Sequence, residues 1–356
     1  MSIRKLKLIA MAFLLVSVLG GALIIVMYHN HDKMIAFAKE KEELKKLDSL
    51  ELLEYYTEQI KLNKEISEFE QQLRIELPGG VSADDVEYKC NYIENTITIK
   101  IPTDDVDYFY DYPMIGKSDK LKDLSLAADG EYAVIEAYCD NVYEAVAEQI
   151  KGHKEYVYVD FVKPSDLYDK VVVIDAGHGD NDPGAVEDGT NEKDINLDIM
   201  LELKALLDEQ DEIKVYYTRT DDSNPSLAQR VNLANGAGAD YFISIHNNTM
   251  SYSSASYVNG TEVMYNENFE GDTNRSKELA TLFADEVSSA FSSTNLGLEE
   301  GSSIYIIRTA NMPMALIEVG FMSNSAELAK LNEKIYQRKV ALAMYDAIFK
   351  AYEQGV

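Results

Sequence analysis

The sequence is poor in cysteine, histidine and positive charge, and it contains no tryptophan. Its 2 cysteines, Cys90 and Cys139, are too few for a disulfide scaffold, and their spacing fits no zinc-binding motif. They are therefore either two buried thiols or one bridge. Against 62 acidic residues stand 33 lysines and arginines, which gives a net charge of −29. Because phosphate backbones repel such a chain, nucleic acid is not expected as a partner.

Apolar runs long enough to cross a membrane are also absent, with one exception near the N-terminus. Residues 8–27 carry no charge and follow the basic segment RKLK. Twenty helical residues span about 30 Å, the thickness of one hydrocarbon core. Because basic residues stay on the cytoplasmic side, residues 1–31 are predicted to form a cytoplasmic N-terminus and a transmembrane signal anchor. A weak small-residue cleavage site at 20–22 makes a cleaved signal peptide the alternative.

Residues 32–83 have the composition of a helix that ends at a turn. Apolar residues from Leu52 to Leu73 recur at three- and four-residue spacings, and the first proline is Pro78. This pattern predicts a helical stalk or a short coiled coil. Self-association through the apolar stripe and packing of the stripe on the next domain both remain open.

Residues 84–168 carry short alternating segments and no recognisable chemical constellation. NYIENTITIKIP and YVYVDFV alternate apolar and polar side chains and predict strands, whereas YEAVAEQIKG fits a helix or a bent strand. We predict a small β-rich or α+β domain, and an interaction or targeting module is the default hypothesis for its role.

Residues 169–356 alternate strand and helix patterns. This order predicts an α/β domain with a mainly parallel, twisted sheet of about six strands and flanking helices. The expected strands are VVVIDAG, IKVYYTR, YFISIHNN, TEVMYN, SIYIIR and MALIEVGF. The expected helices cover 194–207, 227–235, 276–291 and 333–353.

Two histidines stand at strand ends in this domain. His178 follows VVVIDAG, His246 lies in FISIHNN, and the domain contains no other histidine. In open α/β sheets, functional groups collect beyond the carboxyl ends of the strands, so the two imidazoles are expected to converge. A catalytic zinc site needs a third protein ligand, and two histidines with one glutamate form a known set.

Two acidic residues complete this pattern. Glu192 follows a glycine-containing loop at the start of a helix, where it is either a third ligand or a complement to the helix dipole. Glu318 interrupts the apolar strand MALIEVGF, and burial of a carboxylate there is costly unless it is paired or linked to a metal. Because such perturbed groups gather at active sites, we expect both carboxylates to lie beside the two histidines.

Several motifs of this domain occur together and in a fixed order. They are IDAGHGDNDPGA, NEKDINL, TRTDD followed by LAQRVNLAN, ADYFISIHNN and ALIEVGFMSN. Through these motifs, residues 171–352 resemble the zinc-dependent N-acetylmuramoyl-L-alanine amidases of the Amidase_3 class, which cleave bacterial peptidoglycan. The resemblance does not extend over residues 1–165.

The resemblance implies one Zn²⁺ held by His178, Glu192 and His246, with Glu318 as the catalytic carboxylate. It also implies hydrolysis of the amide bond between N-acetylmuramic acid and L-alanine of the stem peptide. Peptidoglycan is then the partner, and the protein is expected in the bacterial cell membrane as a single-pass protein whose catalytic domain faces the wall. The alternatives are another zinc-dependent cell-surface peptidase or amidohydrolase, and a catalytically silent wall-binding protein.

Three further residues are candidates for substrate binding or for support of the site. Asp175 either orients a ligand histidine or caps the turn, as carboxylates beside metal ligands commonly do. Arg308, at the end of SIYIIR, either binds a peptide carboxylate or pairs with an acid. Asn247 stands where the family commonly has alanine, and Asp180 stands where glycine is usual. A tight loop near the metal is expected from the flexibility of three glycines, Gly177, Gly179 and Gly184.

Overall fold

The computed structural model describes residues 71–356, apart from 104, 106–107, 113, 118, 151, 251–256 and 268–272. The predicted anchor and most of the predicted stalk lie outside the described residues. Within the described residues, no helix has the length and apolar character needed to cross a membrane. The chain divides into two compact units between Lys163 and Pro164.

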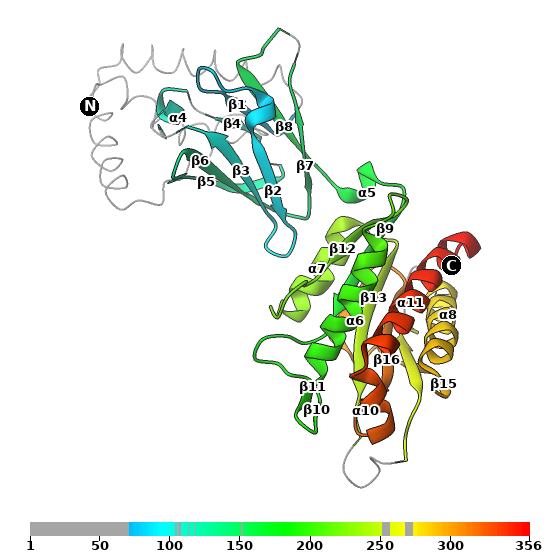
Figure 1. The fold of residues 1–356 in the computed structure, drawn as a ribbon. Coiled ribbons are helices and arrows are strands. Elements are labelled where there is room, and N and C mark those ends of the chain that lie inside the picture. The colour runs from blue at the N-terminus through cyan, green and yellow to red at the C-terminus, as the bar shows by residue number, and fades with distance from the viewer. Residues whose placement is uncertain are drawn as a thin grey trace. The chain divides into compact units, whose positions relative to one another are not determined.

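The N-terminal unit consists of two four-stranded antiparallel sheets that enclose one apolar core (Figure 1). The strand orders are β4-β1-β8-β7 and β2-β3-β6-β5. The strands are β1 (Leu73–Glu76), β2 (Glu87–Asn91), β3 (Thr96–Pro102), β4 (Ile115–Gly116), β5 (Leu121–Asp129), β6 (Tyr132–Cys139), β7 (Glu144–Glu148) and β8 (Tyr156–Val162). A short 3-10 helix, η2 (Ala83–Asp85), and α4 (Tyr108–Asp111) complete the unit. The β-rich alternative is therefore confirmed.

One prediction for this part of the chain is wrong. The predicted helix does not continue through Leu73–Glu76, which forms β1 between β4 and β8. Within these four residues the buried positions alternate with half-buried ones, a period of two that suits a strand, and the neighbouring strands satisfy the backbone. The ambiguous segment YEAVAEQIKG supplies strand β7, and Cys90 and Cys139 form no disulfide bridge.

The C-terminal unit is built on a six-stranded sheet in the order β12-β9-β13-β16-β14-β15. Strands β12, β9, β13 and β16 are parallel, while β14 runs antiparallel to β16 and parallel to β15. The predicted mainly parallel sheet is thus confirmed. The strands are β9 (Val171–Ala176), β12 (Lys214–Tyr217), β13 (Tyr241–Asn248), β14 (Thr261–Tyr265), β15 (Asn295–Glu300) and β16 (Met314–Phe321).

Helices cover this sheet on both faces (Figure 1). On one face, α6 (Glu192–Leu207), α8 (Thr273–Phe291) and α11 (Lys334–Gln354) pack on the main core. On the other face, α7 (Leu227–Ala237) packs against β9, and α9 (Tyr305–Thr309) packs against β16. The remaining elements are α5 (Pro164–Leu167), α10 (Ser325–Leu331) and the hairpin β10 (Val186–Glu187) with β11 (Thr190–Asn191).

Local sequence signals place the helix next to the site. Helix α7 begins with a capping box, in which Ser226 and Gln229 satisfy each other's backbone amides. It ends at Gly238, whose φ of 65° is the left-handed conformation that favours glycine. These signals fix where α7 begins and ends along the chain. Helix α7 in turn packs against β9, the strand that leads to His178.

The prediction for SIYIIR is wrong, and a different segment forms the sixth strand. Its isoleucines and tyrosine favour a strand, yet residues 305–309 form the helix α9, in which the consecutive residues Ile306 and Ile307 are both buried. The sixth strand is β15, at the edge of the sheet, where most side chains are exposed. Its sequence NLGLEE lacks the apolar alternation that marks a buried strand, and so it gave no signal.

Candidate metal centre and active site

His178 lies just beyond the carboxyl end of β9 in an unusual backbone conformation. Its φ is 62°, a left-handed value that side-chain-bearing residues seldom adopt. The imidazole Nδ1 lies 2.8 Å from Asp182 Oδ2, and Nε2 lies 3.2 Å from Glu192 Oε2. The ring therefore points from the loop toward the first turn of α6.

Glycines allow this close approach, as predicted. A Cβ on Gly177 would lie 2.2 Å from the ring of His246, and one on Gly184 would lie 2.4 Å from a carboxylate oxygen of Glu192. Gly179, with φ 141°, passes so close to Ser223 that a Cβ would lie 2.2 Å from its carbonyl oxygen. Asp180 has φ 45°, which accounts for the family's usual glycine at this position.

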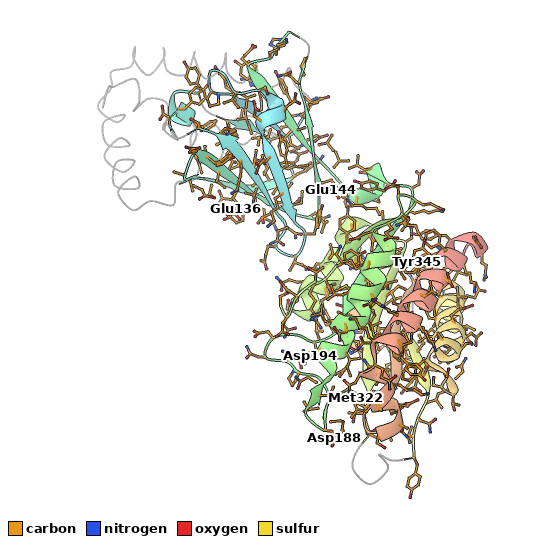
Figure 2. All side chains as sticks on the ribbon, viewed as in Figure 1. Glu136, Glu144, Asp188, Asp194, Met322 and Tyr345 are labelled. Atoms are coloured by element: carbon orange, nitrogen blue, oxygen red, sulfur yellow. The ribbon has the colours of Figure 1, made fainter. Side chains whose placement is uncertain are left out.

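Glu192 lies between the two histidines. It is the first residue of helix α6, which follows the hairpin β10–β11. Figure 2 marks this region by two labels, Asp188 at the tip of the hairpin and Asp194 in the first turn of the helix. Glu192 Oε1 lies 2.9 Å from His246 Nδ1, and the Glu192 side chain is 6% exposed. Its carboxylate thus contacts both imidazoles.

The three predicted ligands form one cluster. The candidate ligand atoms of His178, Glu192 and His246 lie within 4.8 Å of one another. The two imidazole rings are 4.9 Å apart between centroids and nearly perpendicular. Two imidazole nitrogens and one carboxylate oxygen are a donor set that suits zinc.

The charges of the cluster support each other. Burial opposes ionisation of Glu192, but contacts with His178 and His246 outweigh it and hold the pKa of the carboxyl well below its usual range. Burial likewise lowers the pKa of His178, yet Glu192 and Asp182 raise it overall to about 9. The pKa of His246 is also raised, because Glu192 and Glu318 outweigh the effect of burial. A cation bound here would therefore displace protons from the imidazoles.

Glu318 lies beside His246 on the neighbouring strand, in direct register with it. Its Oε2 is buried and has no hydrogen-bond partner among the described residues. Burial raises the pKa of this carboxyl to about 7, although the nearby His246 opposes the shift. A carboxyl with a raised pKa and an oxygen free to accept a proton is suited to proton transfer.

Asp175 performs neither of its predicted roles. Its fully buried carboxylate accepts hydrogen bonds from Arg230 at 2.6 Å, Thr218 at 2.6 Å and Ser244 at 2.6 Å. Burial alone would raise the pKa of Asp175, but Arg230 and the two hydroxyls lower it overall. Asp175 is therefore the buried counter-ion of Arg230, and the carboxylate that contacts Nδ1 of His178 is that of Asp182.

Two buried arginines, which sequence reasoning missed, hold the loop that carries His178. Arg230 donates to the carbonyls of Ala176 and His178, at 2.7 and 2.8 Å. Arg219 donates to the carbonyls of Ala176 and Gly177, at 2.8 and 3.0 Å. Arg219 lies in the motif TRTDD and Arg230 in LAQRVNLAN. Their presence in these motifs was the sequence signal that could have identified them.

Arg230→Ala is expected to destabilise the C-terminal unit by about 3–5 kcal/mol, because Asp175 would remain as a buried charge without its partner. Urea unfolding followed by circular dichroism measures the loss. Arg338→Ala is the matched control: Arg338 pairs with Glu202 at the surface, its side chain is 66% exposed, and less than about 1 kcal/mol is expected. Equal effects of the two substitutions would contradict the assigned role of the buried pair.

Asn247 supports Glu192 through hydrogen bonds, which agrees with one of the two roles predicted for Asn247. Its backbone amide donates to Glu192 Oε1 at 3.1 Å, and its side chain donates to Asn196 at 2.8 Å. Asn196 in turn donates to Glu192 Oε1 at 3.3 Å. Asn196 was not singled out from the sequence.

Arg308 lies on α9, not at a strand end. Its guanidinium donates to the carbonyls of Ser302 and Ser303, at 3.0 and 3.1 Å, and lies over the ring of Tyr305. Among the described residues it pairs with no acid, and pairing with an acid stays a prediction. Binding of a peptide carboxylate stays a prediction.

A cavity of about 210 Å³ opens beside the two histidines. The start of α7 forms its opposite side, with Pro225 and Leu227, and Ile306 of α9 adds a further apolar surface. Leu227 is 53% exposed and so remains available to a ligand. His178 and His246 thus line this cavity, whereas Glu192 and Glu318 are not among its lining residues.

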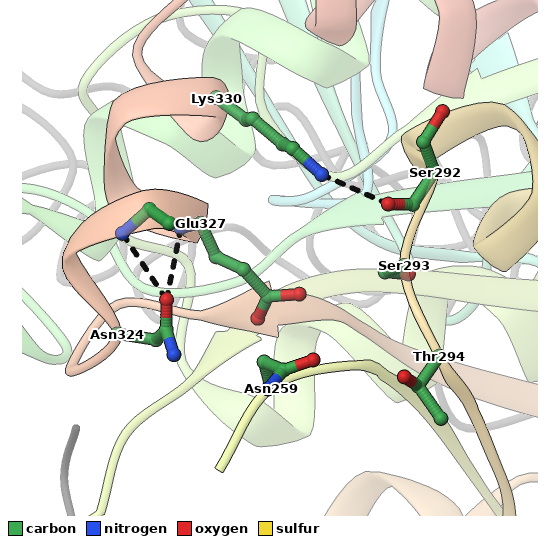
Figure 3. A pocket seen from close by; sticks show the side chains of 8 residues that line it. Asn259, Ser292, Ser293, Thr294, Asn324, Glu327 and Lys330 are labelled. Atoms are coloured by element: carbon green, nitrogen blue, oxygen red, sulfur yellow. Dashed lines mark hydrogen bonds between the residues drawn. The ribbon is translucent and has the colours of Figure 1, made fainter. Parts of the chain in front are cut away.

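A second cavity, of about 390 Å³, lies beside α10 (Figure 3). Its charged groups already have partners: Glu327 accepts from the amides of Gly260 and Phe321, and Lys330 donates to the carbonyl of Ser292. Asn324 caps the helix, as the dashed lines in Figure 3 show. These contacts stabilise the end of β16 and engage both charged side chains of the cavity.

Comparison with known proteins identifies relatives of the C-terminal unit. A family model described as N-acetylmuramoyl-L-alanine amidase (Amidase_3) matches residues 172–350. An uncharacterized Bacillus subtilis protein, YqiI, is 37% identical over 185 residues, which cover 52% of this chain and 86% of that protein. The germination-specific N-acetylmuramoyl-L-alanine amidase of the same species is 31% identical over 202 residues, covering 53% and 82%. The solved catalytic domain of CwlV, an amidase from Bacillus (Paenibacillus) polymyxa var. colistinus, is 36% identical, with coverage of 52% and 98% and a TM-score of 0.48.

Proposed function

The chain belongs to the N-acetylmuramoyl-L-alanine amidase family, whose members are peptidoglycan hydrolases, and from this premise we propose a zinc-dependent reaction at the cluster described above. The bond cleaved is the amide between the lactyl group of N-acetylmuramic acid and L-alanine of the stem peptide. The ligands are His178, Glu192 and His246, and the proton carrier is Glu318.

One observation carries this proposal: a carboxylate whose Oε2 is buried and has no hydrogen-bond partner among the described residues lies in register with a ligand of a two-histidine, one-glutamate cluster. The donor set fits zinc, because two imidazoles and one carboxylate are a known catalytic set that leaves a position open. When bound, zinc supplies Lewis-acid chemistry, which polarises an amide carbonyl and lowers the pKa of a water toward about 7.

Glu318 moves the proton in both halves of the reaction. Its Oε2 accepts a proton from the attacking water, whose oxygen then forms a bond to the lactyl carbonyl carbon. The carbon–nitrogen bond breaks as the same carboxyl delivers this proton to the nitrogen of L-alanine. Because an amine leaves poorly until it is protonated, a single group with a pKa near 7 serves first as base and then as acid.

The other residues hold and enclose the substrate. Leu227 and Ile306 give one side of the cavity an apolar surface that suits the methyl groups flanking the scissile amide. Arg219 and Arg230 keep the loop of His178 in place, so the ligands do not have to reorganise when substrate arrives.

Incubation of the zinc-loaded chain with purified peptidoglycan tests the proposed function. We expect new α-amino groups on L-alanine and intact glycan strands, identified by mass spectrometry of the soluble products. Cleavage within the stem peptide would favour the other zinc peptidase, and binding to the wall without release of fragments would favour the silent module. Either result would overturn the proposed reaction.

The N-terminal half carries a separate proposal. Residues 8–27 would anchor the chain in the bacterial cell membrane, and the unit of two sheets would serve as an interaction module near the wall. The support is the apolar run after a basic segment, which predicts an anchor with the remaining chain outside. Protease accessibility of the C-terminal unit in intact cells without their wall tests it: protection of this unit would contradict the orientation.

A further inference from the structure

Several hydrogen bonds hold the turn from His178 to Asp182 in one conformation. The backbones of Gly179 and Asp182 exchange two hydrogen bonds, at 3.0 and 2.9 Å. Arg230 binds the carbonyl of His178 at 2.8 Å. A left-handed residue other than glycine costs on the order of 1–3 kcal/mol and persists where its surroundings impose it. These contacts impose it on His178, whose φ is 62°.

The carboxylate of Asp182 sits where it decides which nitrogen of His178 carries hydrogen. Asp182 Oδ2 lies 2.8 Å from Nδ1, and Oδ1 accepts from the amide of Gly184 at 3.2 Å. Both ring nitrogens of His178 face a carboxylate, Nδ1 that of Asp182 and Nε2 that of Glu192. A carboxylate can only accept, so when Glu192 and Nε2 bind a metal, the hydrogen of the neutral ring lies on Nδ1, where Asp182 accepts it. The lone pair is then on Nε2, the nitrogen that lies 3.2 Å from Glu192 Oε2 and faces the other ligands.

No other described carboxylate is placed for this task. Asp175, the candidate from the sequence, is taken up by Arg230, Thr218 and Ser244. Glu192 contacts His178 from the side of the other ligands, where it is itself expected to bind the metal.

We propose that Asp182 is the positioning residue of the metal centre: it fixes Nε2 of His178 as the metal-binding atom and sets the direction of the ring. The inference rests on the zinc site of the proposed function. It assigns Asp182 a role that acts through His178, since carboxylates behind ligand histidines hold the ring and raise its basicity.

Zinc affinity of the full-length chain, measured by competition with a chromophoric chelator, tests this role. Asp182→Ala is expected to weaken binding by roughly 10–100-fold, the range found for such partners. Asp182→Asn is expected to lose less, because its amide oxygen still accepts from Nδ1. Asp211→Ala, a change of an exposed aspartate away from the cluster, is the control and should leave the affinity unchanged.

A second measurement separates orientation from general loosening of the loop. In the zinc-loaded chain with ¹⁵N-labelled histidine, wild type and Asp182→Asn are expected to show hydrogen on Nδ1 of His178 and metal on Nε2. In Asp182→Ala, this signature is expected to broaden or to change to a mixture of the two modes. The chain has only 5 histidines, which keeps the assignment simple.

The outcomes distinguish this inference from the function on which it rests. Unchanged affinity and an unchanged His178 signature in Asp182→Ala would overturn the role of Asp182 and leave the proposed amidase reaction intact. A wild-type chain that binds no zinc would overturn the metal centre, and the role of Asp182 with it. Neither measurement uses substrate, so neither depends on catalysis.

Discussion

Glu318→Gln is expected to keep zinc and the fold but to lose amidase activity by on the order of 10² to 10⁴-fold. Glutamine has almost the same shape as glutamate, so the packing around β16 is preserved. It cannot accept the proton of the attacking water or return one to the departing amine. Release of soluble fragments from peptidoglycan, with zinc content measured on the same samples, gives the comparison.

Glu209→Gln is the matched control for this substitution. Glu209 is exposed just after the end of α6 that lies away from the cluster, so its neutralisation should leave activity unchanged. Full activity in Glu318→Gln would remove Glu318 from the reaction. Loss of zinc from that variant would instead indicate that Glu318 helps to hold the metal.

The pH dependence of the wild type offers a second view of the same group. Burial raises the pKa of Glu318 to about 7, and only the deprotonated form can accept a proton from water. Activity is therefore expected to rise with pH through an acid limb. The limb should lie at or somewhat below about pH 7, because a bound cation would lower the pKa of the carboxyl. Residual activity of Glu318→Gln should lack this limb.

His246→Ala is expected to abolish zinc binding and to reduce activity by on the order of 10³-fold or more, since Lewis-acid assistance is worth several kcal/mol. The substitution removes one of three protein ligands and leaves Glu192 Oε1 without the imidazole that lies 2.9 Å away. Metal analysis by mass spectrometry, together with the fragment-release assay, measures both effects.

His153→Ala is the corresponding control, because His153 is exposed in the N-terminal unit, with a side chain 57% accessible, and lies outside the cluster. It should keep full zinc content and activity. If His246→Ala retained one zinc per chain with unchanged affinity, His246 would not be a ligand and the proposed cluster would have to be revised.

The sequence predicted the catalytic domain well where its signals were local or repeated. Buried parallel strands are mostly apolar, as in the run VVVI before Asp175, and two histidines at such strand ends could be placed at one edge of the sheet. The strand prediction for SIYIIR was wrong because the burial of Ile306 and Ile307 within α9 outweighs the strand propensity of the segment. The edge strand β15 was not predicted, because an exposed strand needs no apolar alternation and so carries little sequence signal.

The choice among nearby carboxylates depended on the tertiary structure. Asp175 and Asp182 lie in the same quoted stretch, and Asp175, not Asp182, was singled out from the sequence as a partner of a ligand histidine. The structure separates them, because Asp175 points into a buried pocket closed by Arg230, while the turn at Gly179 brings Asp182 to Nδ1. The contact between Asp182 and Nδ1 of His178 depends on backbone angles such as the φ of His178, and composition does not determine these angles.

By itself, the sequence determined which side chains meet at the candidate site: two imidazoles and a carboxylate near the ends of strands or the start of a helix, and a second carboxylate within an apolar strand. Strand and helix periodicities repeat over many residues, and this repetition makes them readable from one chain. The tertiary structure alone decided how these groups are held, through Arg219, Arg230 and Asp182. Hydrogen bonds between residues far apart in the chain depend on distance and direction in space, and residue order encodes these only through the complete fold.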